Sequence, residues 1–430
     1  MAICVVQQYF SINKILFRVV ALWPYHRSKL VEFHLSFFLV ILISFIAAQL
    51  ATFLTTECTS HMAIKIFSLV LYFTLYLIKY LSFRVNAHTI KCLLEKFQYT
   101  CDELTDEGEI AIIKEYGNEA KHFTIKISLW GMFNILTTCL LPVFPRILRT
   151  FTSTNVSDEH FMIHIPTEYF IDQKKYYYCI LLHMDVNFFM GTTVLIATGT
   201  LLFGCMKYMC GLFRIASYRI DQTMKTPMFQ IAGLSKDCVI YKNILHAIDI
   251  HRKAIEFCDV IKSNFVGMFF IEMLISVTSL SLNLYGLHQA MMLGSATEEY
   301  LVYAKGILVT LLYISVCNYV GQELTDHHNH MFISIYSVQW YVTPLHIQKI
   351  ILFLLQRGTK NLYLAFGGIL VMSIENVTTV KLFHVMSCYK IISNYNLPTS
   401  MHFELKNEKY VSDGKRFHII FHRSPFYAAN

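Results

Sequence analysis

Charged residues are scarce in this chain of 430 residues, since they make up only 15% of it while hydrophobic residues make up 55%. Glycine, with 17 residues, and proline, with 8, are too sparse for the strand-and-turn pattern of a porin-like barrel. The mean hydropathy of +0.46 is one that soluble globular proteins rarely reach. The composition therefore predicts a membrane protein, and its long apolar runs predict that the spans are helices.

Sequence signals of catalysis and of metal centres are also missing. The 12 cysteines stand singly, with no CxxC pair, so they predict neither a disulfide framework nor a zinc ribbon. No GxSxG, HExxH or Gly-rich phosphate loop occurs. We therefore expect no enzyme, no metal, no cofactor and no nucleic-acid partner. Residues 1–20 lack the features of a cleavable signal peptide, so we expect the N-terminus to be retained.

Six apolar runs approach the ~20 residues that a helix needs to cross a bilayer. They are residues 33–54, 62–83, 123–144, 177–203, 265–287 and 301–320. A seventh run extends from 362 to about 392. The sequence thus predicts an all-α membrane protein with seven transmembrane helices.

Lysine and arginine predict how these spans are oriented. With the N-terminus inside, the inner segments hold 21 of these residues and the outer segments between spans hold 4. Because cytoplasmic loops retain the excess of Lys and Arg, we expect a cytoplasmic N-terminus and an extracellular C-terminus. This inverted topology is the reverse of a rhodopsin-like receptor, and the Asp-Arg-Tyr and NPxxY motifs of that class are absent.

Helical patterning continues beyond membrane length in residues 91–122 and 207–262, with charged residues on the polar face. Two further apolar runs, 331–342 and 345–355, are too short to cross a bilayer. Pro344 suits the first turn of a helix in the second of them. These segments predict an inner layer of packed helices that suits subunit assembly better than catalysis.

A cluster of acidic and imidazole side chains precedes the first of these short runs. Its members are Glu323, Asp326, His327, His328 and His330. Imidazole and carboxylate are zinc ligands, so the cluster suggests a metal or solute transporter as an alternative function. A solvated helix segment just inside the membrane is the simpler interpretation, because a metal path would also need such residues in several spans.

Aromatic residues gather in the outer halves of the predicted spans. A single such residue more often serves in helix packing or in the aromatic belt at the membrane interface. Together, however, these residues predict an apolar pocket between helices. We assign ligand binding to Tyr72, Phe73, Tyr76, Phe133 and Phe188. Lys65 and Lys79 share roughly one face of the second span. They either snorkel to the two interfaces or face a water-filled cavity.

The seventh predicted span carries a stripe that lipid would not accommodate. At helical spacing it presents Asn376, Thr379, Phe383, Ser387, Lys390 and Asn394. Since a lysine is costly in hydrocarbon, this face predicts a pore or its vestibule, with helix packing as the alternative.

Several segments together resemble the insect odorant receptor family. They are LFRVVALWP at 16–24, KKYYYCILLHMD at 174–185, CGLFRIASYRI at 210–220, HRKAIEFCDVI at 251–261, GQEL at 321–324, QWY at 339–341 and SIENVTTVKLFHVMSCY at 373–389. The resemblance covers roughly 380 residues. The gustatory receptors, a sister family and a second alternative, typically carry Thr-Tyr and Gln-Phe pairs in the last span, which residues 386–395 lack.

The resemblance implies a ligand-gated, non-selective cation channel in which this chain is the ligand-tuned subunit of a heterotetramer with a shared odorant co-receptor. Because the long second intracellular insertion of the co-receptor is missing, this chain resembles the tuned subunit. The implied ligand is a small volatile molecule, and the implied location is the plasma membrane of an olfactory sensory neuron dendrite, where the chain contacts membrane lipid. The family's last helix lines the pore, and aligning it through Tyr389 puts the gate near Ile392, which lies off the polar stripe.

Five segments follow from these arguments. We expect a cytoplasmic N-terminus at 1–32, six transmembrane helices with cytoplasmic extensions at 33–320, cytoplasmic anchor helices at 321–361, a seventh, pore-lining helix at 362–395 and an atypical basic tail at 396–430. Pore or gate roles are assigned to Ser387, Lys390 and Ile392. Asn155 heads an NVS sequon in a predicted outer segment, so we expect it to carry a glycan.

Overall fold

The computed structural model describes residues 5–25, 28–56, 59–140, 165–225, 235–294, 297–358, 362, 365–366 and 370–373. In these residues all of the regular secondary structure is helical except for one short strand pair. The elements are α1 (Val5–Gln8), α2 (Ser11–Val19), α3 (Lys29–Thr55), α4 (Ser60–Val85), α5 (Ala87–Asp102), α6 (Glu107–Leu140), α8 (Tyr177–Lys225), α9 (Ser235–Leu293), α10 (Thr297–Ser337), the 3-10 turn η1 (Trp340–Val342), α11 (Leu345–Gly358), β1 (Ala365–Phe366) and β2 (Leu370–Val371).

Six of these helices, α3, α4, α6, α8, α9 and α10, are long and apolar enough to cross a membrane. They contain the first six predicted spans, apart from residues 141–144 of the third, which lie outside the described residues. Hydroxyl side chains define two of their starts. Ser28 accepts a hydrogen bond from the Val31 amide at the start of α3, and Thr59 accepts one from the Met62 amide at the start of α4, both at 3.3 Å. These caps satisfy amides that have no partner within the helix.

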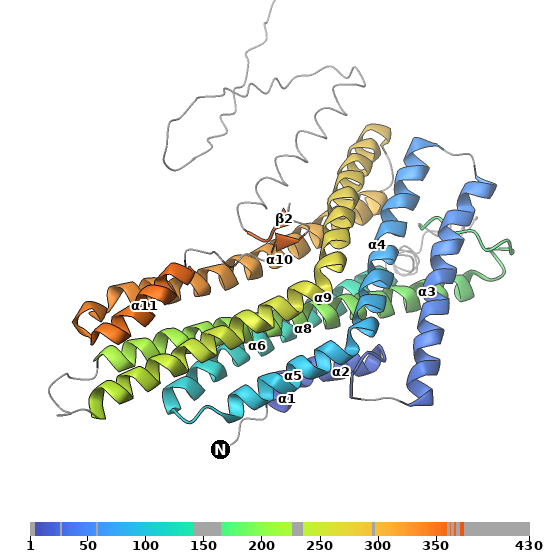
Figure 1. Ribbon diagram of the computed structural model, residues 1–430. Helices are drawn as coiled ribbons and strands as arrows, with labels where there is room; N and C mark the ends of the chain where they lie inside the picture. Colours follow the sequence, from blue (N-terminus) through green and yellow to red (C-terminus); the bar gives the residue numbers. More distant parts are fainter. Residues whose placement is uncertain are drawn as a thin grey trace, which may run out of the picture.

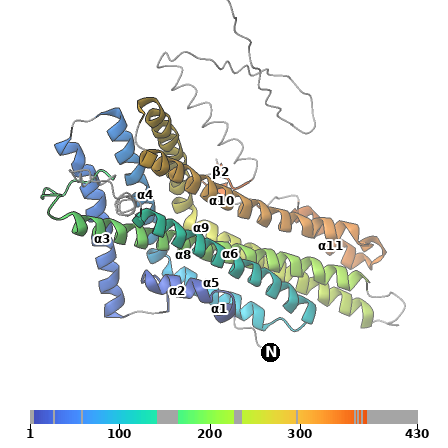
Figure 2. The same ribbon diagram turned by 180° about the vertical axis from the view of Figure 1, so that it is seen from behind.

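Helix α8 lies at the centre of the molecule and packs against α2, α3, α4, α6, α9 and α10. Figures 1 and 2 show α6, α8, α9 and α10 running side by side as a long bundle, with α11 folded back along α10. In the same views α3 and α4 stand at one end of this bundle. The site described below lies where α4 meets the bundle.

Small residues explain how so many neighbours approach α8. At Gly204 an added Cβ would lie 2.7 Å from the Phe10 ring, so only glycine fits there. The threonine hydroxyls of this helix donate to carbonyls one turn earlier, as Thr198 does to Val194 at 2.8 Å and Thr200 does to Ile196 at 2.7 Å. Their polarity is thereby satisfied within the helix, so α8 can be buried on several sides.

The N-terminal helix α2 is anchored on the same bundle. Phe17 is fully buried and contacts the rings of Trp23 and Phe83. The buried side-chain amide of Asn13 donates to the Thr200 hydroxyl at 2.8 Å. The WP segment at 23–24 therefore closes a packed N-terminal structure against α8.

The helical extensions predicted at 91–122 and 207–262 are present as far as the described residues extend, which leaves out 226–234. α5 and the first part of α6 occupy the former, and the latter contains the end of α8 and the first part of α9. Tyr208 stacks on Phe97, with ring centroids 4.0 Å apart, and its hydroxyl donates to the Phe97 carbonyl at 2.9 Å. At the edge of this layer, the Lys253 ammonium lies 2.6 Å from the Glu103 carboxylate. The extensions thus form a packed layer.

Two sequence predictions on helix boundaries are wrong. Residues 331–337 continue α10 without a break and 340–342 form η1, so no separate helix begins at 331. The helix after Pro344 does begin at Leu345, as predicted. The seventh predicted span does not begin as a helix at 362, because Ala365–Phe366 pairs antiparallel with Leu370–Val371. Gly367 and Gly368 stand between these strands, and glycine lowers the propensity for helix.

Candidate functional site

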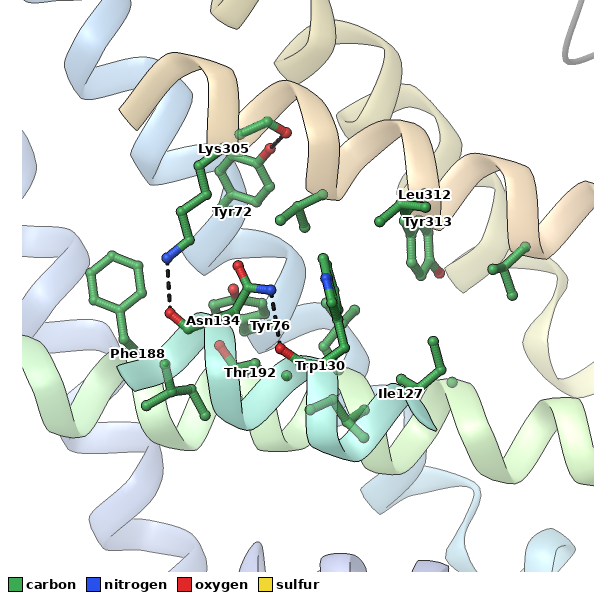
Figure 3. Close-up of a pocket in the computed structure, with 18 of the residues that line it drawn as sticks. Tyr72, Tyr76, Ile127, Trp130, Asn134, Phe188, Thr192, Lys305, Leu312 and Tyr313 are labelled. Carbon is green, nitrogen blue, oxygen red and sulfur yellow. Dashed lines mark hydrogen bonds between the residues drawn. The ribbon is translucent and has the colours of Figure 1, made fainter. Parts of the chain in front are cut away.

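A cavity of about 790 Å³ lies between α4, α6, α8 and α10. This volume is in the range of sites that hold small organic molecules. Figure 3 shows its wall, with aromatic and aliphatic side chains from these helices turned toward one another. Among the described residues that line it are Leu69, Tyr72, Tyr76, Phe123, Ile127, Trp130, Asn134, Phe188, Thr192, Ile196, Phe203, Phe269, Lys305, Val309, Leu312, Tyr313 and Met372. The wall is therefore largely apolar, with a few polar groups.

Three of the five aromatic residues assigned to ligand binding line this cavity, namely Tyr72, Tyr76 and Phe188. Phe73 does not line it: this ring is fully buried between α3 and α8, with its centroid 4.6 Å from that of Phe45 and 5.1 Å from that of Phe188. Phe133 does not line it either, since its side chain is 63% exposed on α6. The aromatic content of a span does not show whether a given ring faces the cavity, the packed interior or the surface, because neighbouring positions on a helix point in different directions.

Sequence reasoning missed most of the lining from α6 and α10, including Trp130, Asn134, Lys305 and Tyr313. One available signal was Lys305 itself. An ionisable residue inside an apolar run marks a cavity or a functional site far more often than a lipid-facing surface. Lys305 lies within the predicted span 301–320, so this signal could have directed attention to α10.

Two polar contacts join the helices across the cavity. The Tyr72 hydroxyl of α4 donates to the Gly306 carbonyl of α10 at 2.8 Å and lies 2.5 Å from the Thr310 hydroxyl. The Lys305 ammonium of α10 donates to the Asn134 carbonyl of α6 at 2.8 Å, as the dashed line in Figure 3 shows. A ligand in the cavity would therefore contact groups that hold α10 against both neighbours.

The two lysines of the second predicted span have acidic partners. The Lys65 ammonium lies 2.7 Å from a carboxylate oxygen of Glu299, and that of Lys79 lies 2.6 Å from one of Glu272. Both lysines line the cavity, at opposite ends of α4. The Lys79 pair is almost fully buried, with side-chain exposures of 1% and 2%. Lys79 therefore faces the interior and does not snorkel to an interface.

The acidic and histidine cluster of α10 is dispersed in the structure. Glu323 pairs with Lys207 of α8 at 2.5 Å, and His327 contacts the Tyr116 hydroxyl of α6 at 2.6 Å. His328 is buried and stacks on His251 of α9, with ring centroids 5.5 Å apart. Within the described part of the chain, no three His, Cys, Asp or Glu side chains converge in a metal-binding arrangement. Glu323, His327 and His328 instead join α10 to three neighbouring helices, whereas Asp326 and His330 contact Gln322 and Ser334 of α10 itself.

The remaining site predictions fall outside the described residues. They concern the glycosylation site Asn155 and the pore or gate residues Ser387, Lys390 and Ile392. The tail at 396–430 is also outside them.

Two of three comparisons with known proteins yield matches. Residues 59–383 match the family model described as 7tm Odorant receptor. The fold is similar to the insect olfactory receptor OR5 from Machilis hrabei, both in complex with eugenol (TM-score 0.71) and in a second structure of OR5 (TM-score 0.72). In each case the identity is 14%, and the match covers 91% of this chain and 99% of the other. Comparison with curated protein sequences yields no match.

Proposed function

The chain belongs to the 7tm odorant receptor family, and on that premise we propose that it is the ligand-tuned subunit of a heteromeric, ligand-gated, non-selective cation channel that detects small volatile molecules. The observation that carries this proposal is the apolar, aromatic-lined cavity between α4, α6, α8 and α10. Membership of this family also means that the chain is a receptor rather than an enzyme, and it supports an odorant receptor over the gustatory alternative.

The size and lining of the cavity support a small, mostly apolar ligand. Burying roughly 100 to 200 Å² of ligand surface at about 25 cal/mol per Å² contributes only a few kcal/mol. We therefore expect micromolar or weaker affinity. Tyr72, Tyr76 and Phe188, which line the cavity, are the proposed contacts; Phe73 would act behind the wall through its contact with Phe188.

A physical route from this cavity toward the proposed pore runs through α10. Met372 lines the cavity, and an added Cβ on Gly321 of α10 would collide with it. The Ser373 amide donates to the Asn318 side chain of α10 at 3.1 Å, and the Thr325 hydroxyl donates to the Leu362 carbonyl at 3.0 Å. Helix α10 thus holds residues on both sides of the β1–β2 pair, ahead in the sequence of the proposed pore or gate residues Ser387, Lys390 and Ile392.

Ligand binding opens a channel only insofar as the ligand prefers the open arrangement. We propose that a ligand against α10 shifts Met372 and the segment that follows it. Ser387, Lys390 and Ile392 are the proposed pore or gate residues, supported by the polar stripe of the sequence and by the family resemblance. The packed layer formed by α5, α11 and the extensions of α6, α8, α9 and α10 is the proposed contact surface for a heterotetramer with an odorant co-receptor.

The proposed setting is the plasma membrane of an olfactory sensory neuron dendrite, with the N-terminus inside and the C-terminus outside. The charge distribution of the sequence supports this orientation. It would place the packed inner layer, including the Lys253–Glu103 pair, in the cytoplasm.

The test is co-expression of this chain with an odorant co-receptor in oocytes while volatile compounds are applied and current is recorded. We expect ligand-evoked inward cation current only when both subunits are present. Tyr72→Ala should lower potency for the active volatile, because it removes both a wall of the cavity and a link to α10. Solute uptake by this chain alone, without ligand-evoked current, would support a transporter instead.

A matched pair of glycine variants makes this test specific to the cavity. An added Cβ on Gly191 would collide with the Tyr76 ring, whereas one on Gly199, which lines the cavity in the same helix, meets nothing within 4 Å. We expect Gly191→Ala to displace Tyr76 and shift potency at least tenfold, while Gly199→Ala stays within about threefold. Equal effects of the two variants at equal surface expression would show that the Tyr76 wall does not contact the ligand.

A further inference from the structure

The charged residues that line the cavity are all of one sign. Among the described residues of its wall there is no aspartate or glutamate, whereas four lysines line it: Lys65, Lys79, Lys126 and Lys305. A cation facing an apolar cavity is costly unless an anion or several hydrogen-bond acceptors compensate it. Each of these four lysines is therefore expected to have a compensating group.

Lys65 and Lys79 are compensated, because each pairs with a carboxylate behind the wall, Glu299 and Glu272. Lys126 is exposed on α6, so the protein does not enclose its charge. Lys305 differs from all three. It is partly buried, and within the described chain no carboxylate lies within ion-pair distance of its ammonium.

Neutral oxygens surround the Lys305 ammonium. It donates to the Asn134 carbonyl at 2.8 Å, to the Thr137 hydroxyl at 3.1 Å and to the Thr138 hydroxyl. The two threonine hydroxyls donate to that same Asn134 carbonyl. The cradle therefore supplies hydrogen-bond acceptors but no negative charge, so it solvates the ammonium without neutralising it.

The position of Lys305 suits contact with a ligand. Its side chain runs from α10 toward Asn134 on α6 and stands beside the aromatic residues that the ligand would contact (Figure 3). The next residue, Gly306, accepts the hydrogen bond from Tyr72, so a group bound at Lys305 would lie near the link between α4 and α10. The rest of the wall offers aliphatic and aromatic surface for an apolar tail.

We propose that the cavity prefers small volatile carboxylic acids, bound as carboxylates with the acid group at Lys305 and the hydrocarbon tail among Tyr76, Trp130 and Phe188. This inference rests on the proposed function as a ligand-gated receptor and names the chemical class of its ligand. Lys305 is the specificity-determining residue in it. A carboxylate provides the charge that the neutral cradle lacks, whereas an alcohol or an aldehyde replaces one neutral acceptor by another.

The first measurement needs no variant. Hexanoic acid, hexanamide, hexan-1-ol and hexanal share one chain length and differ in the polar group, and each is applied at pH 7.4 to oocytes that express this chain with the co-receptor. We expect the acid to activate at a concentration at least tenfold lower than the amide or the alcohol. Activation by the alcohol or the aldehyde with no advantage for the acid would overturn the inference and leave the proposed function intact. Absence of current with any volatile would count against the proposed function itself.

The second measurement separates charge recognition from helix tethering. Lys305→Gln retains a hydrogen-bond donor without the charge, Lys305→Arg retains the charge, and Lys126→Gln is the control for an exposed lysine of the same wall. We expect Lys305→Gln to raise the half-maximal concentration for the acid at least tenfold more than that for the alcohol, and Lys305→Arg to keep the acid preference. Equal loss of the responses to acid and alcohol in Lys305→Gln, at normal surface expression, would show that Lys305 only tethers α10 to α6.

Discussion

Replacing Lys79 by methionine leaves the carboxylate of Glu272 buried without its partner, and we expect this change to destabilise the protein strongly. The ammonium of Lys79 lies 2.6 Å from Glu272, the two side chains are 1% and 2% exposed, and the ammonium lies 5.2 Å from the centre of the Tyr313 ring. Removing one partner of such a pair typically costs about 3 to 5 kcal/mol, because the remaining charge cannot be solvated. The folded population relative to the unfolded one should fall by a factor on the order of a hundred or more.

The same helix supplies a matched control. Lys65 forms a pair of similar length with Glu299, but these side chains are 13% and 20% exposed, and Glu299 has a second neighbour in His61. Partial access to solvent and a second neighbour should reduce the cost of Lys65→Met to about 1 kcal/mol. The double variant Lys79→Met with Glu272→Leu removes both charges, and we expect it to recover most of the loss.

The assay is the thermal midpoint of each variant, measured by loss of the monodisperse peak in detergent, together with surface biotinylation in cells. The expected order of stability is wild type, Lys65→Met and the double variant close together, with Lys79→Met well below them. If Lys79→Met and Lys65→Met had equal effects, burial would not control the strength of these pairs. A double variant as unstable as the single one would show that the loss came from packing rather than from charge.

Two further predictions concern parts of the chain outside the cavity. Wild type treated with a glycosidase should shift in mobility and Asn155→Gln should not, because the charge distribution places this sequon outside; a glycan that persists in the variant would contradict the topology. In the inner layer, the hydrogen bond from Lys253 holds the pKa of Glu103 below its ordinary value of 4.5. The stabilisation from this pair is therefore present above pH 4.5 and is lost as the pH falls through the lowered pKa. The difference in thermal midpoint between wild type and Glu103→Gln should therefore shrink toward pH 3. A difference that widens toward pH 3 would contradict this prediction.

Hydropathy predicted the first six spans well because the length of an apolar run is a local property of the chain. Each predicted run lies within one observed helix as far as the described residues extend. The two wrong predictions of helix boundaries concern segments whose local composition is compatible with more than one structure. Residues 331–337 have the composition of a short separate helix, but they continue α10, since no proline or glycine interrupts them. The run after 362 is apolar enough for a span, yet it begins as a strand pair next to two glycines.

The sequence predicted an apolar pocket between helices, but it identified only some of the residues that line the cavity. Tyr72 and Tyr76 lie one helical turn apart on α4, and both line the cavity. Phe73 lies next to Tyr72 in sequence and faces α3 and α8 instead. Which face of a membrane helix meets a cavity depends on its neighbours, because lipid and the protein interior accept the same apolar side chains.

The sequence by itself determined that this is a helical membrane-type protein, where its first six candidate spans lie and which family it resembles, and it supplied a prediction of their orientation. Each of these follows from composition, run length or motif, which are properties of the unfolded chain. Only the tertiary structure decided that Lys79 is compensated by Glu272 and that, among the described residues, the Lys305 ammonium donates to neutral oxygens of α6. The partners of these two lysines come from helices that are distant in the sequence. The free energy of a buried charge depends on the groups within a few ångströms of it, and packing decides which groups those are.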